Sequence, residues 1–346
     1  MDMVVKGLER VQYPKELLEL VIVDNPHPVH GPSVPYLQRE VLPKSGVTIP
    51  HTTILGQSTN TGFAGGNNVG VQWAIDHGFD YVFFLNNDAY TTERTFDELV
   101  SVFASDPKIG IAQSLVLLEP DRHLINSSGN MIHFCGFGFC RDYREAIADK
   151  RYAPIEDIAY ASGSAFMVPV ALCKELGGWD GDFFLYHEDT EWSLRLRTRG
   201  YRVVLASQSI VHHAYEFSRS ISKFYWMERN RYVILLMFLK WPTLVLIAPA
   251  LCVFELGTWI AAFKGGWAGE KLKVYLYWLT PSTWSLWLKK RSATQAARII
   301  DDKALTATFA SEILYQEPSM QNPLLTQVVN PVMHWYWSVV RWMMVW

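Results

Sequence analysis

The segment FDYVFFLNND, from Phe79 to Asp88, decides the fold class. Its centre, Tyr81 to Leu85, is apolar and aromatic, as is typical of a buried strand, and two amides and a carboxylate follow at once. The segment LLELVIVDN, from Leu17 to Asn25, has the same form, and Phe63 to His77 between them has a helical pattern. Alternating strands and helices predict an α/β protein with an open sheet. Ligands of such sheets bind beyond the carboxyl ends of the strands, where these polar residues lie.

The composition sets further limits. The chain has 346 residues, 49% of them hydrophobic, which is enough for a catalytic domain and an appendage. A net charge of -3 gives no overall basic field, so we expect no nucleic acid partner. The four cysteines match neither a zinc ribbon nor a redox motif, which indicates free thiols in a reducing compartment. The first residues mix charges with apolar side chains too finely for a secretory signal, so we expect the amino end in the cytosol.

The last third of the chain differs from the rest in tryptophan content, because eleven of the fourteen tryptophans in the whole chain follow residue 225. Indole side chains favour the membrane-water interface. We therefore predict a catalytic domain over residues 1–225 and a Trp-rich, hydrophobic helical region, associated with a membrane, over residues 226–346. Within that region, residues 244–263 form a stretch of about the length that crosses a bilayer, although Glu255 and Pro249 interrupt it. A transmembrane span, a re-entrant segment and an interfacial helix all fit this stretch.

The final stretch, Val332 to Trp346, has few charges and dense aromatic residues. This composition favours an interfacial anchor. The alternative is a helix that packs on the catalytic domain or on a second subunit.

The turn after the strand at Tyr81 to Leu85 is a candidate metal site. Asn86, Asn87 and Asp88 place two amides and a carboxylate at the rim of the sheet. Such oxygen ligands suit Mg²⁺ or Mn²⁺ that is held partly by a substrate diphosphate. The alternative is a strand-ending turn in which Asn and Asp bond to their own backbone.

A glycine-rich segment, Asn60 to Asn68, opens the next predicted helix. Its glycines allow close backbone approach and its free N–H groups suit a diphosphate, although it is neither a Walker A nor a GxGxxG motif. Such a helix start also occurs without any ligand.

Two later segments carry further candidates. The helix predicted to start near Tyr186 begins with Glu188 and Asp189, which are available for acid–base chemistry or simply favoured by the helix dipole. A zinc-protease motif is excluded, because Glu191 stands where its second histidine belongs. His213, after an apolar run, could bind the same metal or the diphosphate, or it could be a hydrogen-bonded structural histidine.

Together these segments resemble the family 2 glycosyltransferases, in particular the rhamnosyltransferase-like branch. The resemblance covers roughly residues 5 to 240 and rests on the order and spacing of seven motifs. These motifs are Val21-Ile-Val-Asp-Asn25, Asn60-x-Gly-Phe-Ala-Gly-Gly-Asn-Asn68, Phe84-Leu-Asn-Asn-Asp88, Ser162-Gly-Ser-Ala165, Gly177-Gly-Trp-Asp180, Phe184-x-x-x-Glu-Asp-x-x-Trp192 and Glu228-Arg-Asn-Arg231. The resemblance implies a GT-A fold, which is a Rossmann-like open mixed sheet flanked by helices.

The resemblance also implies roles for individual residues. Asp189 is expected to be the catalytic base, with Glu188 beside it, and Asp24 is expected to contact the nucleobase of the donor. The remaining donor-binding residues are expected to be Asn60, Gly65, Gly66, Asn67 and Asn87. The sugar and acceptor side is expected to include Ser162, Gly163, Trp179, Asp180 and Trp192. Asp88 and His213 are expected to hold Mg²⁺ or Mn²⁺.

The function implied is an inverting, metal-dependent transfer of a sugar from a nucleotide-diphosphate donor to a hydroxyl group. The Trp-rich region suggests membrane lipid as a partner, a lipid-linked or cell-surface glycan as acceptor, such as a polyprenyl-linked one, and a catalytic domain on the cytoplasmic face.

One departure from the family pattern supports an alternative. Family members begin with an apolar strand, whereas this chain begins in the helix expected after it, near Val4 to Tyr13. A catalytically silent scaffold or binding subunit is therefore the alternative function, and a nucleotide-sugar hydrolase is a third.

Overall fold

The computed structural model describes residues 1–27, 29–215, 223–313 and 323–346. The strands are β1 (Glu19–Asp24), β2 (His51–Gly56), β3 (Tyr81–Leu85), β4 (Ala89–Thr91), β5 (Ile109–Leu118), β6 (Ile125–Ser127), β7 (Asn130–Ile132), β8 (Gly138–Cys140), β9 (Ile155–Asp157), β10 (Ala165–Pro169) and β11 (Arg202–His213). The helices are α1 (Asp2–Arg10), α2 (Val34–Glu40), α3 (Gly62–Asp76), α4 (Thr95–Ser105), α5 (Val170–Leu176), α6 (Glu188–Thr198), α7 (Lys223–Phe238), α8 (Trp241–Lys264), α9 (Ala268–Trp278), α10 (Pro281–Ala296), α11 (Asp302–Leu305) and α12 (Asn330–Met343). Short helical turns are η1 (Lys15–Leu17), η2 (Leu42–Lys44), η3 (Ile147–Asp149), η4 (Gly181–Phe183), η5 (Thr306–Thr308) and η7 (Leu325–Val329).

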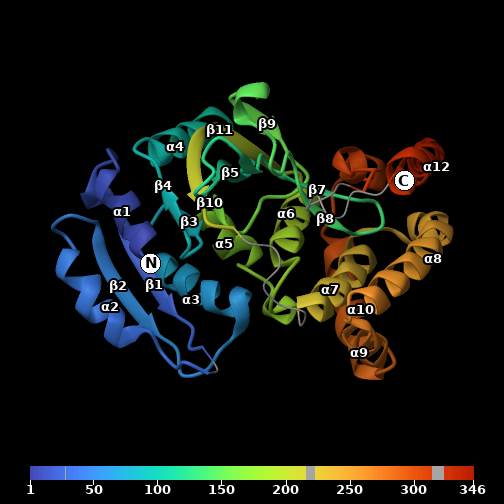
Figure 1. Ribbon diagram of the computed structural model, residues 1–346, viewed down its shortest axis with the longest axis horizontal. Coiled ribbons are helices and arrows are strands. Elements are labelled where there is room, and N and C mark those ends of the chain that lie inside the picture. Colours follow the sequence, from blue (N-terminus) through green and yellow to red (C-terminus); the bar gives the residue numbers. More distant parts are fainter. Residues whose placement is uncertain (28, 216–222, 314–322) are drawn as a thin grey trace.

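A mixed seven-stranded sheet forms the centre of the molecule (Figure 1). Its main order is β3-β10-β5-β11-β4, with β6 beside β5 and β9 beside β11. Strands β5 and β11 are parallel, whereas β10 is antiparallel to both of its neighbours. Strands β1 and β2 pair in parallel as a separate two-stranded sheet. The predicted α/β class with an open mixed sheet flanked by helices is therefore confirmed.

The central strands are buried on both faces, because helices cover each side of the sheet. Along β11, Val203 and Leu205 pack into the cluster that also holds residues of α3, α5 and α6. The intervening Val204 and Ala206 pack into a second cluster, with residues of α1, α2 and α4. Successive side chains of a strand point to opposite faces, so an apolar run without alternation is what this two-sided burial requires.

Local predictions match these elements closely. The predicted strand at Tyr81 to Leu85 is β3, and the predicted helix from Phe63 to His77 is α3. Among the described residues, no backbone hydrogen bond joins β1 to β3, and the two strands belong to different sheets. The expectation that a first strand is missing stays a prediction.

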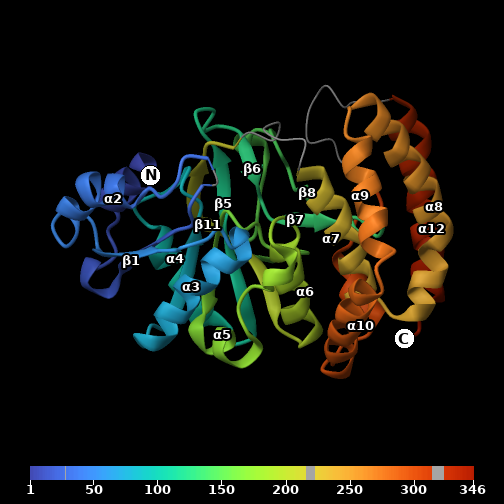
Figure 2. The same cartoon turned by 90° about the horizontal axis from the view of Figure 1, so that it is seen from below.

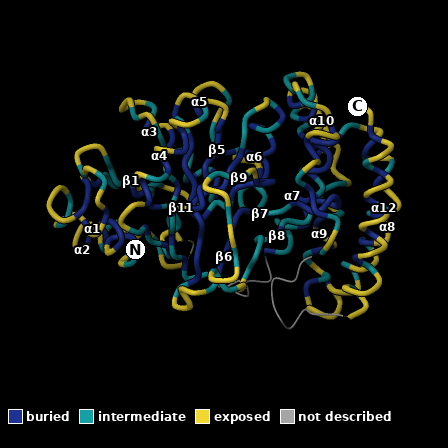
Figure 3. Tube along the Cα trace, turned by 90° about the horizontal axis from the view of Figure 1, so that it is seen from above, coloured by how far each residue is buried: buried dark blue, intermediate teal, exposed yellow. Residues whose placement is uncertain are grey.

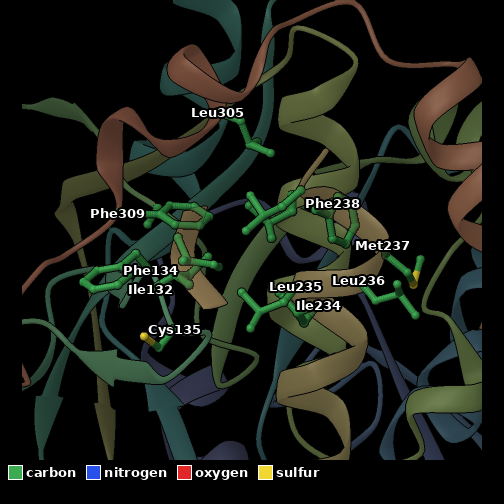
Figure 4. Packing of buried hydrophobic residues seen from close by; sticks show 14 of the residues in the cluster. Ile132, Phe134, Cys135, Ile234, Leu235, Leu236, Met237, Phe238, Leu305 and Phe309 are labelled. Atoms are coloured by element: carbon green, nitrogen blue, oxygen red, sulfur yellow. The ribbon is translucent and has the colours of Figure 1, made fainter. Parts of the chain in front are cut away.

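Helices α7 to α10 and α12 lie together beside the sheet (Figure 2). One hydrophobic cluster joins them to the β7-β8 pair and to the segment before α6. Ile132 and Phe134 pack with Ile234 and Phe238 of α7 (Figure 4), Phe183 of η4 belongs to the same cluster, and further members come from α8, α10 and α12. The cluster therefore draws side chains from both sides of residue 225, and the predicted domain boundary at that position stays a prediction.

Much of α8, α9 and α12 is exposed (Figure 3). Many of the exposed side chains on their outer faces are apolar, and we call this surface the apolar wall. Its larger members are Val245, Val253, Leu256, Ile260, Phe263, Leu272, Leu276, Val332, Trp335, Val339, Trp342 and Met343. Among the described helices, α8 alone has the length and apolar composition that crossing a membrane requires. It contains the predicted stretch 244–263.

Candidate active site

The two predicted metal ligands lie side by side at the rim of the sheet. His213 ends β11, which pairs with β4, so its ring lies beside the Asn86–Asp88 turn that precedes β4. Its Nε2 atom lies 3.1 Å from Oδ1 of Asp88, and its Nδ1 atom lies 2.9 Å from Oδ1 of Asn126. His213 is buried, whereas the Asp88 side chain is 43% exposed. Asn126 therefore holds the His213 ring on its Nδ1 side, and the Asp88 carboxylate is open to solvent.

The chemistry of this pair suits a divalent cation. The Asn126 oxygen faces Nδ1, which favours a proton on that nitrogen and leaves Nε2 directed towards Asp88. A cation between Nε2 and the Asp88 carboxylate would be held by both groups. In the described part of the chain, no group of three or more His, Cys, Asp or Glu side chains gathers. The remaining ligands of Mg²⁺ or Mn²⁺ would come from a diphosphate and water.

Asp24 and the glycine-rich segment meet at the end of β1. The Asp24 carboxylate is buried and accepts hydrogen bonds from the N–H groups of Ser33 and Val34, at 2.8 and 3.0 Å, at the start of α2. Next to it, Asn25 donates to Asn60 Oδ1 at 3.2 Å. The end of β1 is therefore hydrogen-bonded to the start of α2 through Asp24 and to Asn60 through Asn25. We call this region the corner at the end of β1.

The glycines of this corner allow close packing at the start of α3. A Cβ atom on Gly66 would lie 3.3 Å from Nδ2 of Asn25, and one on Gly65 would lie 2.6 Å from the Thr61 side chain. Asn67 donates to the Phe63 carbonyl within the same helix, at 2.9 Å. Asn87, on the neighbouring turn, is exposed.

The carboxylate pair begins α6. Asp189 Oδ2 accepts from the Gly163 N–H at 3.1 Å, and its Oδ1 accepts from the Thr190 N–H at 2.7 Å. Burial raises the pKa of Asp189 to about 6 despite these bonds. Burial, with the neighbouring charge of Asp189, raises the pKa of Glu188 well above its usual value. Asp189 therefore has the proton affinity of a general base near neutral pH.

One short segment connects the carboxylate pair to the metal pair. Gly163 donates to Asp189, as above, and the carbonyl of Ser164 accepts from the Asn86 N–H at 3.0 Å. Ser162 is held in turn by Gln113, whose Oε1 accepts from its N–H at 2.7 Å. Residues 162–164 therefore bridge the Asn86–Asp88 turn and the carboxylate pair.

The remaining predicted acceptor-side residues are placed differently. Trp192 is fully buried, and its ring lies 4.9 Å from that of Trp179, which is also buried in the core. Both indoles thus contribute to packing under the site. Asp180 forms a salt bridge with Lys290 of α10 at 2.5 Å and accepts from the Asp182 N–H.

The family is decided by a match that covers most of the chain. The model of Glycosyl transferase family group 2 matches residues 81–344. The chain belongs to this family. The predicted resemblance to family 2 glycosyltransferases and the prediction of a transferase are thereby confirmed. The rhamnosyltransferase-like branch stays a prediction.

This family 2 chain is also similar to a curated relative, the low-salt glycan biosynthesis hexosyltransferase Agl10 of Haloferax volcanii. The two are 24% identical over 141 residues, which are 40% of this chain and 44% of the relative. The match therefore spans less than half of the relative's length.

Two solved glycosyltransferase structures share its fold. The crystal structure of GalNAc-T7 with UDP, GalNAc and Mn²⁺ has a TM-score of 0.52 at 15% identity, covering 68% of this chain and 44% of that one. The mannosyltransferase PcManGT from Pyrobaculum calidifontis, in complex with GDP-Man and Mn²⁺, has a TM-score of 0.50 at 15% identity, covering 86% and 81%. At these identities the likeness concerns the fold alone, and it confirms the GT-A type.

Three asparagines of this family 2 chain received no role from the sequence. Asn25 links two loops, Asn68 bonds both the N–H and the carbonyl of Trp179 at 2.8 Å each, and Asn230 bonds carbonyls before α6. All three lie inside motifs that carried the resemblance. Their partners are distant in sequence, so only the motif itself signalled them.

Proposed function

We propose that this protein is an inverting glycosyltransferase that moves a sugar from a nucleotide-diphosphate donor to a hydroxyl group of a glycan or lipid-linked acceptor. The observation that carries the proposal is the bridge formed by residues 162–164. It brings the Asp88–His213 pair, suited to a cation and a diphosphate, next to the partly buried Asp189, suited to accept a proton. The two solved structures named above contain a nucleotide and Mn²⁺, which supports this assignment of the donor side.

The chemical step is a single displacement. The acceptor oxygen forms a bond to the anomeric carbon, while the bond from that carbon to the diphosphate oxygen breaks and its electron pair leaves with the nucleoside diphosphate. Asp189 takes the acceptor proton. Attack from the face opposite the leaving group inverts the anomeric carbon.

Asp88 and His213 would hold the metal, with Asn126 fixing the imidazole from behind. A bound Mg²⁺ or Mn²⁺ supplies positive charge beside the departing diphosphate. Asp24, Asn60, Gly65, Gly66, Asn67 and Asn87 would line the donor side around it. Ser162, Gly163 and Asp180 would face the acceptor side.

The test is nucleoside-diphosphate release from a panel of UDP-, GDP- and dTDP-sugars with a membrane-lipid extract and Mn²⁺. Release that requires metal, Asp88 and Asp189 supports the proposal, and Asp149→Asn, an exposed aspartate, is the control for charge loss. Release without acceptor consumption indicates a hydrolase. If no donor releases a nucleoside diphosphate while donor binding is retained, the protein is the catalytically silent scaffold.

We further propose that the apolar wall rests on the cytoplasmic face of a lipid bilayer. The exposed faces of α8 and α12 are almost wholly apolar, and the carboxylates of the three wall helices α8, α9 and α12 are Glu255, which is paired on the inner side, and Glu270, which is paired with Lys273. The exposed charges of these helices, such as Lys264 and Lys273, are cationic. Apolar faces with a cationic edge suit an anionic membrane surface, and a lipid-linked acceptor would be delivered there.

Helix α8 fits this surface as an in-plane helix rather than a transmembrane one. Its exposed side chains follow one face along the whole helix, while the opposite face buries Ile247 and Phe254 in the shared core. Glu255 on this inner side pairs with Lys271 at 2.6 Å and with Arg231 at 3.3 Å. Crossing the bilayer would separate these groups.

Cys252 offers a probe of this arrangement, because it is exposed on α8 while the other three cysteines are buried or partly covered. A fluorophore on Cys252, quenched by lipids with nitroxides at known depths, is expected about 5–10 Å below the surface. A depth near the middle of a hydrocarbon core about 30 Å thick would mean that α8 spans the membrane.

A further inference from the structure

The loop that leads into α6 has a strained backbone. At Phe184 the dihedral angles are φ 61° and ψ -58°, and the Leu185 N–H donates to the Phe183 carbonyl at 2.7 Å, which together define a tight γ-turn. Tyr186 and His187 follow, each with φ 64°. None of these residues is glycine, so the conformation persists only where the surrounding structure holds it.

Two consecutive side chains of α7 hold this loop. Asn230 is fully buried, and its amide nitrogen lies 3.0 Å from the carbonyl oxygens of Phe183 and Leu185 and 2.6 Å from that of Tyr186. The two amide hydrogens are thus shared among three acceptors. The Arg229 guanidinium donates to the Asp182 carbonyl at 2.6 Å and, through Nε, to Oδ1 of Asn230 at 2.7 Å.

The start of α3 holds the loop from the other side. The Phe63 N–H donates to the Phe184 carbonyl at 2.9 Å, and a Cβ atom on Gly62 would lie 2.5 Å from the Phe184 ring. Every backbone carbonyl from residue 182 to residue 186 therefore accepts a hydrogen bond. Arg229 and Asn230 donate to four of these five carbonyls.

Helix α7 is itself fixed at the same point. Glu228 and Arg231 flank the two loop-holding residues and face the opposite direction, towards α8 and α9. Lys271 of α9 bonds Glu228 at 2.8 Å, and Arg231 contacts Glu255 of α8 at 3.3 Å. This short segment of α7 thus joins the loop to the helices of the apolar wall.

We propose that Asn230, oriented by Arg229, is a positioning residue for the Glu188–Asp189 pair. The inference rests on the proposed function, in which Asp189 accepts the proton of the acceptor. The held loop ends at His187, immediately before the pair, so its conformation sets where the first turn of α6 begins. A displacement of about 1 Å at a reacting group can lower a rate about a hundredfold.

The experiment uses the full chain in lipid nanodiscs with two variants. Asn230→Asp keeps the shape of the side chain but turns its donor into a carboxylate that faces three carbonyls. Arg229→Lys is milder, because it keeps a cation over the Trp226 ring, 4.5 Å away, but loses the planar fork that bonds Asp182 and Asn230. The matched control is Asn330→Asp, because Asn330 is also buried and also bonds loop backbone, at Ile313.

Two quantities are measured for each variant: kcat and the donor KM from product release, and amide hydrogen exchange of residues 182–190. We expect kcat to fall about tenfold in Arg229→Lys and about a hundredfold in Asn230→Asp, with donor KM within twofold of the native value. Exchange at residues 182–190 should accelerate in both, and the control should change neither quantity.

The outcomes separate this inference from the proposed function. Unchanged exchange at residues 182–190 in both variants overturns the inference whether or not the native chain transfers sugar, as does faster exchange with an unchanged kcat. A native chain without transferase activity refutes the proposed function, and faster exchange in the variants then still supports the holding of the loop.

Discussion

Replacing the candidate base, Asp189→Asn, is expected to abolish transfer and yet stabilise the protein at alkaline pH. Burial raises the pKa of Asp189 from 3.8 to about 6, so the ionised side chain destabilises the folded state. A shift of about two units corresponds to about 3 kcal/mol at pH 8 and, by proton linkage, to about 1 kcal/mol at pH 4.5, where the folded side chain is mostly protonated. The sign follows because the unfolded state, with the lower pKa, releases the proton first.

The amide cannot accept both the Gly163 and the Thr190 N–H groups, and the loss of one hydrogen bond costs about 1 kcal/mol at either pH. The net gain in the free energy of unfolding is therefore about 2 kcal/mol at pH 8 and close to zero at pH 4.5. Urea unfolding followed by tryptophan fluorescence at both pH values measures it, with Asp149→Asn as control. An equal change at the two pH values would refute the assignment of the raised pKa to Asp189.

Three further predictions concern the same site and its support. The native kcat/KM should fall about tenfold per pH unit below pH 6, because the pKa of Asp189 is raised to about 6 and the protonated form accepts no proton; a profile that is flat down to pH 4.5 excludes it as the base. His213→Ala should weaken Mn²⁺ about 10–100-fold in titrations of product release, since Asp88 loses its neighbour, and an unchanged titration removes His213 from the metal site. Lys271→Met should lower the free energy of unfolding by about 3 kcal/mol, because Glu228 and Glu255 lose a buried cation. Denaturation in detergent measures this change. An unchanged free energy of unfolding would mean that Arg231 alone compensates the charges of Glu228 and Glu255.

Local patterns were sufficient for the elements that carry the site. The aromatic run at Tyr81 to Leu85 and the helical spacing after Gly62 predicted β3 and α3, because strand and helix periodicity are properties of a few neighbouring residues. The pairing of β10 between β3 and β5 was not predicted, since β10 lies about eighty residues after β3 and about fifty after β5, and such pairing leaves no local trace.

The candidate site was predictable to a similar extent. Asp88 and His213 were proposed as a pair from separate strand ends, and the structure brings them within 3.1 Å. The motif that contains Trp192 could not show which way the indole points, and the side chain is fully buried. The loop contacts of Asn230 reach backbone more than forty residues away, so no periodicity could reveal them.

The shared cluster of Figure 4 also has a consequence for biosynthesis. The ring of Phe134 stacks on that of Trp337, with centroids 4.7 Å apart. The ribosome therefore adds the stacking partner of Phe134 about two hundred residues after Phe134 itself. At about 5–20 residues per second, the ribosome leaves Phe134 uncovered for roughly 10–40 s. During this interval the nascent chain exposes an apolar surface that chaperones or a nearby membrane must shield, and synthesis that stops at residue 225 would leave that surface open permanently.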